Sequence, residues 1–156
     1  VEENVMFPLT MLTEEMTDQE KIDRVNFCLK RVGLEGVNDK MPSEISGGMQ
    51  KRVGIARAIV LNPKYLFVDE PNSGLDPQTA IKIDALILEI TKEYDMTTVI
   101  VTHDMNSVVD IGENIIYLSR GEKLWEGNKD SIITANIPEL NVFLDSSTLM
   151  KKWRNG

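Results

Sequence analysis

Two short segments carry residue types that act on phosphates. The first is Ser46-Gly47-Gly48, which stands at the start of an apolar pattern with helical spacing. Serine is a good N-cap residue, and the first amides of a helix are unpaired and lie at the positive end of its dipole. Glycine lets an incoming group approach the backbone closely. The segment therefore predicts a phosphate-binding helix N-terminus, and the alternative is an N-capped surface helix with two glycines.

The second segment is Asp69-Glu70, which ends the apolar run Tyr65–Val68. Such a run predicts a parallel strand buried on both faces, and ligands of open α/β sheets bind beyond the carboxyl ends of the strands. One carboxylate there can hold Mg²⁺, and the other can orient or deprotonate water. The alternative is a pair of polar loop residues.

The first element predicted to position these segments is a helix that begins at a capping box. Thr17 and Glu20 have the capping-box spacing, apolar residues follow at intervals of three and four, and Gly33 is a natural residue after a helix end. Cys28 falls on this apolar stripe and is predicted to be a buried structural thiol. Upstream, Pro8 predicts that helix is disfavoured at that point.

Downstream, Asp76 is predicted to cap a helix that has Pro77 at its first position and ends near Tyr94. The β-branched run Met96–Thr102 predicts a second buried strand, with His103 at its carboxyl end. Lone histidines are usually structural, but this position favours a functional role.

The rest of the chain predicts small elements. Asp104 is expected to cap a short helix. Strands are expected at 114–118 and 123–126, joined by a hairpin turn, and short helices are expected to start at Asp130 and Pro138. The basic residues 151–156 are expected to form a frayed tail.

Four motifs along the chain resemble those of the ATP-binding-cassette (ABC) ATPases and occur in the order that is typical of that family. Ile45–Ile59 resembles their signature motif, Tyr65–Glu70 their Walker B strand, Ser73–Asp76 their D-loop and Thr102–Asp104 their switch histidine. The resemblance implies an α/β P-loop NTPase fold, present in part as a helical signature subdomain and part of a mainly parallel sheet. It implies a helical subdomain over about 1–61, a core over about 62–127 and a helical C-terminal tail over about 128–156.

The resemblance also implies a head-to-tail pair of ATPase subunits. By motif, Ser46, Gly47 and Gly48 would contact the γ-phosphate of ATP bound to the partner subunit. Asp76 would lie in the D-loop, which links the two sites. Met49 stands where the family most often has glutamine, and a thioether cannot replace the hydrogen bonds of an amide.

Within the chain's own site, the resemblance implies that Asp69 is in the Mg²⁺ shell and that Glu70 is the general base toward water. His103 would contact the γ-phosphate of ATP. The chemistry is positioning and charge neutralisation around in-line phosphoryl transfer.

The sequence contains no Gly-Lys dipeptide and so no phosphate loop of the G-x-x-x-x-G-K-[ST] type. We therefore expect the C-terminal portion of an ABC ATPase that is inactive alone, and the alternative is a small protein that lacks the loop. In the family, the strand leading into that loop lies beside the His103 strand. We expect the paired strands Tyr65–Val68 and Thr97–Thr102 to expose apolar faces and edges without it.

Two segments, Glu3–Leu9 and Met41–Met49, resemble the ATPases of Mla-type phospholipid transporters. This resemblance implies partner permeases, a substrate-binding protein of the Mce kind and a cytoplasmic position at the inner face of the membrane. The alternatives are a transporter of another small substrate and an ABC ATPase outside transport. The net charge of −8 argues against nucleic-acid partners.

Overall fold

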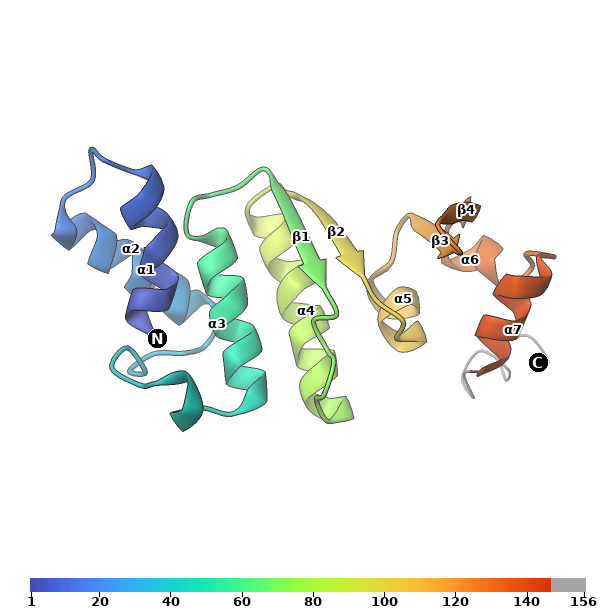
Figure 1. Cartoon of the computed structure of the whole chain (residues 1–156), viewed down its shortest axis with the longest axis horizontal. Helices are drawn as coiled ribbons and strands as arrows, with labels where there is room; N and C mark the ends of the chain where they lie inside the picture. The colour runs from blue at the N-terminus through green and yellow to red at the C-terminus, as the bar shows by residue number, and fades with distance from the viewer. Residues whose placement is uncertain (147–156) are drawn as a thin grey trace. The chain divides into compact units, whose positions relative to one another are not determined.

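The computed structural model describes residues 1–146 and divides into two compact units that meet in sequence between Val101 and Thr102. The first unit contains helices and one parallel strand pair (Figure 1). Its elements are α1 (Glu2–Leu12), α2 (Asp18–Arg31), the 3₁₀ turn η1 (Pro42–Glu44), α3 (Gly47–Ile59), β1 (Tyr65–Asp69), α4 (Pro77–Glu93) and β2 (Thr97–Val101).

Three helices of the first unit, α2, α3 and α4, begin at the predicted capping residues. Thr17 and Glu20 form a capping box at the start of α2, and Gly33 follows the end of α2 with a φ of +68°. Ser46 caps α3, where its hydroxyl accepts a hydrogen bond from the Met49 N–H (3.3 Å). Local capping chemistry is therefore sufficient to set these boundaries.

The prediction that Pro8 interrupts helix is wrong, because α1 continues through it. Proline removes one backbone donor and crowds the preceding turn. Val5 and Leu9, on either side of Pro8, are completely or almost completely buried. Their burial in the core outweighs the local penalty, since helices in proteins are stabilised mainly by packing of an apolar face.

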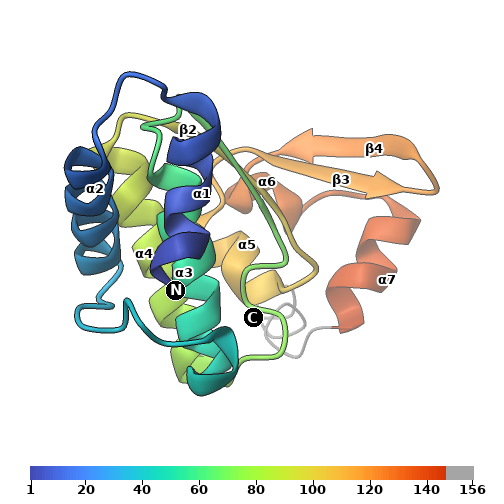
Figure 2. The same cartoon turned by 60° about the vertical axis from the view of Figure 1, so that its left-hand side comes forward.

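Side chains from α1 to α4 and β1 share one core, and Figures 1 and 2 show α3 between α1 and α4. The predicted apolar stripe of α2 lies in this core, and Cys28 is fully buried there. Burial raises the pKa of the Cys28 thiol, and the nearby charge of Arg24 opposes that rise. The thiol is therefore structural, as predicted.

Two arginines join the ends of α2 and α3 in opposite directions. Arg24 of α2 donates to the carbonyls of Ile59 and Val60 at the end of α3 (3.0 and 2.8 Å). Arg52 of α3 donates to the carbonyl of Gly33, just beyond α2 (3.1 Å). Arg24 thus binds backbone carbonyls at the end of α3, and Arg52 binds a backbone carbonyl in the turn that follows α2.

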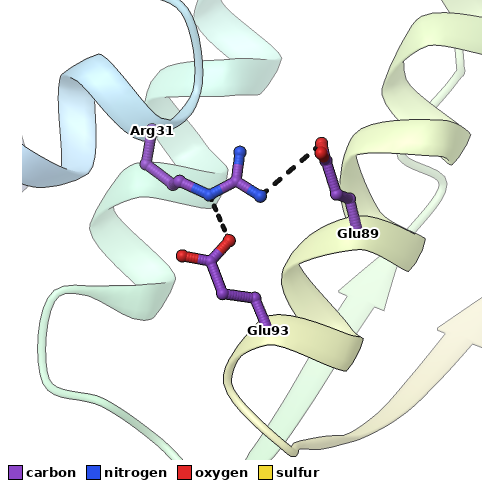
Figure 3. A network of polar contacts seen from close by, with 3 residues as sticks. All are labelled: Arg31, Glu89 and Glu93. Atoms are coloured by element: carbon purple, nitrogen blue, oxygen red, sulfur yellow. Dashed lines mark hydrogen bonds and ion pairs between the residues drawn. The ribbon is translucent and has the colours of Figure 1, made fainter.

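A third arginine connects α2 to α4. Arg31 forms ion pairs with Glu89 (3.5 Å) and Glu93 of α4, and Figure 3 shows the guanidinium between the two carboxylates. The Arg31 side chain is 22% exposed, so water screens this network less than it screens a fully exposed pair.

The strands β1 and β2 pair in parallel, from Tyr65 opposite Thr97 to Asp69 opposite Val101. The prediction that β1 is buried on both faces is wrong for this structure, and β2, predicted to be a buried strand, is exposed in part. Leu66 is 4% exposed, but Phe67 is 75% exposed and Val101 58%. The helices of the first unit cover one face of the pair, and the other face is apolar and exposed, as expected for a pair without its neighbouring strand.

The second unit contains a hairpin and short helices. Its elements are α5 (Met105–Ile111), β3 (Ile115–Ser119), β4 (Glu122–Gly127), α6 (Lys129–Ile132) and α7 (Pro138–Ser146). The hairpin is antiparallel, and Asp104 caps α5 as predicted. Its core contains Met105, Ile132 and Leu144. The predicted tail at 151–156 lies outside the described residues.

Among residues 1–146, no helix has the length and apolar character needed to cross a membrane.

Gly48, at the start of α3, is buried against α4. A Cβ atom placed on Gly48 would lie 2.7 Å from Thr79 Cγ2, which is closer than real Cβ contacts. Thr79 is itself held, because its N–H and hydroxyl both donate to Asp76 at the start of α4 (3.0 and 2.5 Å). The absence of a side chain at Gly48 therefore allows the N-terminal turns of the two helices to touch.

We predict that Gly48→Ala lowers the free energy of unfolding by about 1–2 kcal/mol, because the added methyl overpacks the contact with Thr79. Gly54→Ala is the matched control. Gly54 is on the same helix, and a Cβ atom added to it would meet nothing within 4 Å, so alanine should stabilise the protein by about 0.5–1 kcal/mol. Thr79→Ser removes Cγ2 and keeps the hydroxyl, so the Gly48→Ala/Thr79→Ser double variant should recover most of the loss. Chemical denaturation of the wild-type protein and of these three variants measures the changes, and equal stability of the Gly48→Ala and Gly54→Ala variants contradicts the prediction.

Candidate functional site

A groove of about 680 Å³ in the first unit brings together most of the residues predicted to contact nucleotide. Ser46, Gly47 and Gly48 line it from the start of α3. Gly74 and Asp76 line it from the loop before α4. The signature-type and D-loop-type segments therefore face one cavity, although 26 to 30 positions separate Ser46–Gly48 from Gly74–Asp76 in sequence.

The start of α3 has the backbone geometry of an anion site. Gly47 and Gly48 are its first residues, and the first backbone bond of the helix forms only at Gln50, whose N–H donates to the Ser46 carbonyl (2.9 Å). The glycine amides therefore precede the helical ladder, at the positive end of the dipole. Arg31, Arg52 and Lys82 also line the groove, together with the carboxylates of Asp76 and Glu89, so its wall carries charges of both signs.

Asp76 has a structural role in addition to its place in the groove. It caps α4, and hydrogen bonds from the Thr79 hydroxyl and backbone N–H hold the pKa of Asp76 below its usual range. The same loop is also fixed by Asn72, whose amide nitrogen donates to the buried Asp84 carboxylate (2.9 Å). The loop that carries Asp76 is thus anchored to α4 on both sides of Gly74.

Asp69 and Glu70 stand at the end of β1 but have different backbone conformations. Asp69 is the last strand residue, is exposed and pairs in register with Val101. Glu70 leaves the strand in the left-handed region, with a φ of +47°, and its N–H donates to the Val101 carbonyl (2.9 Å). Non-glycine residues rarely adopt this conformation.

The donor set fits Mg²⁺ only in part. Within the described residues, no group of three or more His, Cys, Asp and Glu side chains is arranged to hold a metal ion. Mg²⁺ is commonly held by one or two carboxylates together with waters and substrate phosphates. Asp69 can supply one such carboxylate, and the remaining ligands would have to come from nucleotide and water.

His103 belongs to the second unit and is exposed there. The structure places it between Thr102 and Asp104, where the Asp104 N–H donates to the Thr102 hydroxyl (3.0 Å) and Asp104 caps α5. His103 is two residues beyond Val101 in sequence, and its predicted contact with phosphate stays a prediction.

Sequence reasoning missed Lys51. Its ammonium donates to the carbonyl of Glu70 (2.9 Å), and Lys51 also lines a second groove of about 470 Å³ together with Asp69. The spacing indicated that Lys51 lies on the same helix face as Gly47, because the two residues are four positions apart. Nothing in the sequence indicated that β1 would end against that face.

Residues 1–73 match the protein family described as ABC transporter. The chain is 39% identical to the methionine import ATP-binding protein MetN of Campylobacter jejuni, over 88% of this chain and 41% of that protein. It is also 39% identical to the probable ribonucleotide transport ATP-binding protein mkl of Mycobacterium leprae, over 92% of this chain and 41% of that protein. The chain thus spans about two fifths of the length of these relatives.

The fold is similar to that of a solved structure described as a dimeric post-hydrolysis state of the ATP-binding cassette MJ0796 bound to ADP and Pi. The TM-score is 0.72 at 39% sequence identity, over 82% of this chain and 56% of that one. The agreement in fold accompanies the match in sequence, and it extends beyond the residues that match the family. In both sequence and fold, the chain is thus similar to ABC transporter ATPases.

Proposed function

We propose that the chain carries part of an ATP-hydrolysing site that powers a transporter. The observation that carries this proposal is the shared groove, in which the glycine amides of α3 and the Asp76 loop line one cavity with Arg52 and Lys82. Unpaired helix amides and cations together suit a polyphosphate. The proposal concerns a full-length protein, because this chain matches only about two fifths of the length of its relatives.

In the proposed site, Ser46, Gly47 and Gly48 contact the γ-phosphate of ATP bound to a second ATPase subunit. The MJ0796 cassette is described as dimeric, which supports a two-subunit arrangement. Asp76 links the two sites through its loop. The role of Ser46 as the cap of α3 is compatible with this, because a hydroxyl oxygen has two lone pairs and a rotating proton.

Within its own site, Asp69 contributes to the Mg²⁺ shell, Glu70 takes a proton from the attacking water and His103 contacts the γ-phosphate. Mg²⁺, when bound, neutralises charge on the phosphate oxygens. The exposed carboxylate of Asp69 at the strand end and the distinct backbone conformation of Glu70 support separate roles for the two acids.

We predict that Glu70→Gln in the full-length protein lowers the rate of ATP hydrolysis by about 10²–10⁴-fold, because the amide cannot accept the proton from water. The affinity for ATP should stay within about twofold, since the change is isosteric. Glu15→Gln, at an exposed position between α1 and α2, is the matched control and should not alter the rate. Steady-state ATPase assays and ATP titration measure both quantities, and a Glu70→Gln rate within about threefold of wild type excludes the general-base role.

Mixed dimers test the proposal that Ser46 of one subunit contacts the ATP bound to the other subunit. Ser46→Asp keeps a good N-cap but adds a negative charge that repels phosphate, and Ser46→Asn keeps the cap without that charge. If Ser46 serves the partner, Ser46→Asp on one chain and Glu70→Gln on the other leave one site without a lesion. Both substitutions on the same chain leave no intact site.

Single-turnover hydrolysis of bound ATP should therefore proceed in about half of the sites for the first arrangement and in none for the second. The opposite pattern shows that Ser46 and Glu70 act in the same site. The Ser46→Asn dimer, assayed in parallel, separates loss of the serine hydroxyl from repulsion of phosphate.

We propose a phospholipid as the transported substrate, on the strength of the Mla-type resemblance of Glu3–Leu9 and Met41–Met49. The complex would then include permease subunits, with the ATPase on the cytoplasmic face of the membrane, and a partner of the Mce kind. The names of the relatives support other small substrates, because one relative is described as importing methionine and another as a probable transporter of ribonucleotides.

We predict that the complete transporter in phospholipid vesicles moves labelled phospholipid in an ATP-dependent manner and does not accumulate labelled methionine or ribonucleotide. The Glu70→Gln protein in the same vesicles is the control for ATP dependence. Uptake of methionine or of a ribonucleotide, with no movement of lipid, would replace the lipid proposal with the substrate that is taken up.

A further inference from the structure

Glu70 is held in a backbone conformation that a non-glycine residue does not favour. Glu70 has a φ of +47°, in the left-handed region that favours glycine. Such a residue persists only where its surroundings hold it in place, and such positions cluster at functional sites. The conformation is therefore a reason to ask which groups fix Glu70.

Hydrogen bonds from three parts of the first unit hold this residue. Its N–H donates to the Val101 carbonyl of β2 (2.9 Å), and its carbonyl accepts from the Ser73 N–H (3.3 Å) and from the Lys51 ammonium (2.9 Å). Pro71 has no N–H, so the Glu70 carbonyl is the sole hydrogen-bonding group of the peptide that joins them. A group that binds this carbonyl sets the orientation of that peptide plane.

Lys51 is suited to this task. It is partly buried, and a charged donor makes a stronger hydrogen bond than a neutral one. It comes from α3, whose first residue is Gly47, and four residues of helix span about 6 Å. A shift of the α3 N-terminus would thus reach the Glu70 carbonyl through about one helical turn and one side chain.

We propose that Lys51 is a positioning residue, which holds the backbone of Glu70 so that its carboxylate meets the attacking water. The proposal rests on the proposed role of Glu70 as general base. It also connects the segment offered to the partner's nucleotide, Ser46–Gly48, with the acid that acts on the chain's own nucleotide.

The first test uses Lys51→Met in the full-length protein, which keeps the length of the side chain and removes its donor. We expect kcat for ATP hydrolysis to fall by about 10–100-fold, because small misplacements of a catalytic group cost this much. KM for ATP should stay within about twofold. Lys51→Arg restores a charged donor and should recover kcat to within about threefold. Lys64→Met, at an exposed lysine just before β1, is the matched control and should leave kcat unchanged.

A role in stability alone is separated by combining Lys51→Met with Glu70→Gln. If Lys51 acts through Glu70, the double variant has the same residual rate as Glu70→Gln alone. A further fall of about 10-fold or more in that background shows that Lys51 acts elsewhere and overturns the proposal, as does an unchanged kcat for Lys51→Met. A Glu70→Gln protein that keeps the wild-type rate instead overturns the proposed role of Glu70, so the two failures are distinguishable.

Discussion

The carbonyls left unpaired at helix ends are the constraint on which the first unit depends. Arg24 extends from the first half of α2 to carbonyls at the end of α3, and Arg52 extends from the first half of α3 to the carbonyl of Gly33, just beyond α2. These bonds place the C-terminal end of each helix near the middle of the other, and sliding one helix along the other would break both sets of bonds. The start of α3, which carries Ser46 and the two glycines, is thereby placed relative to α2.

The position of α4 follows from contacts at its two ends. Near its C-terminus, Arg31 of α2 pairs with Glu89 and Glu93. Near its N-terminus, Gly48 of α3 meets Thr79. The cavity between Ser46 and Asp76 is consequently formed where the N-termini of two helices approach, and electrostatic attraction for an anion is a product of the packing.

The parts of this arrangement that could be predicted from sequence are the local ones. The capping box at Thr17, the N-caps at Ser46, Asp76 and Asp104 and the hairpin turn depend on a few adjacent residues, and the structure has them where the sequence predicted. The interruption at Pro8 failed because the burial of Val5 and Leu9 outweighs a local penalty. The burial of β1 on both faces failed because it depends on whatever lies against the strand, which side-chain type alone does not specify.

The candidate site shows the same division. The residue types and their order predicted Ser46, Asp69 and Glu70 as candidates, because their chemistry is written in short motifs. The bond from Lys51 to the Glu70 carbonyl could not be predicted, since it joins a helix to a strand end nineteen positions away. The left-handed conformation of Glu70 has no sequence signal that distinguishes it from an ordinary strand end.

Cys28 has a consequence for how the opening of this core can be followed in time. Its thiol is fully buried and its pKa is raised, so the native state offers an alkylating reagent neither access nor much thiolate. Chemical labelling at this position must therefore wait for α2 to separate from its neighbours. Because the sequence has a single thiol, the rate at which Cys28 is alkylated reports the rate at which the helical part of the molecule opens.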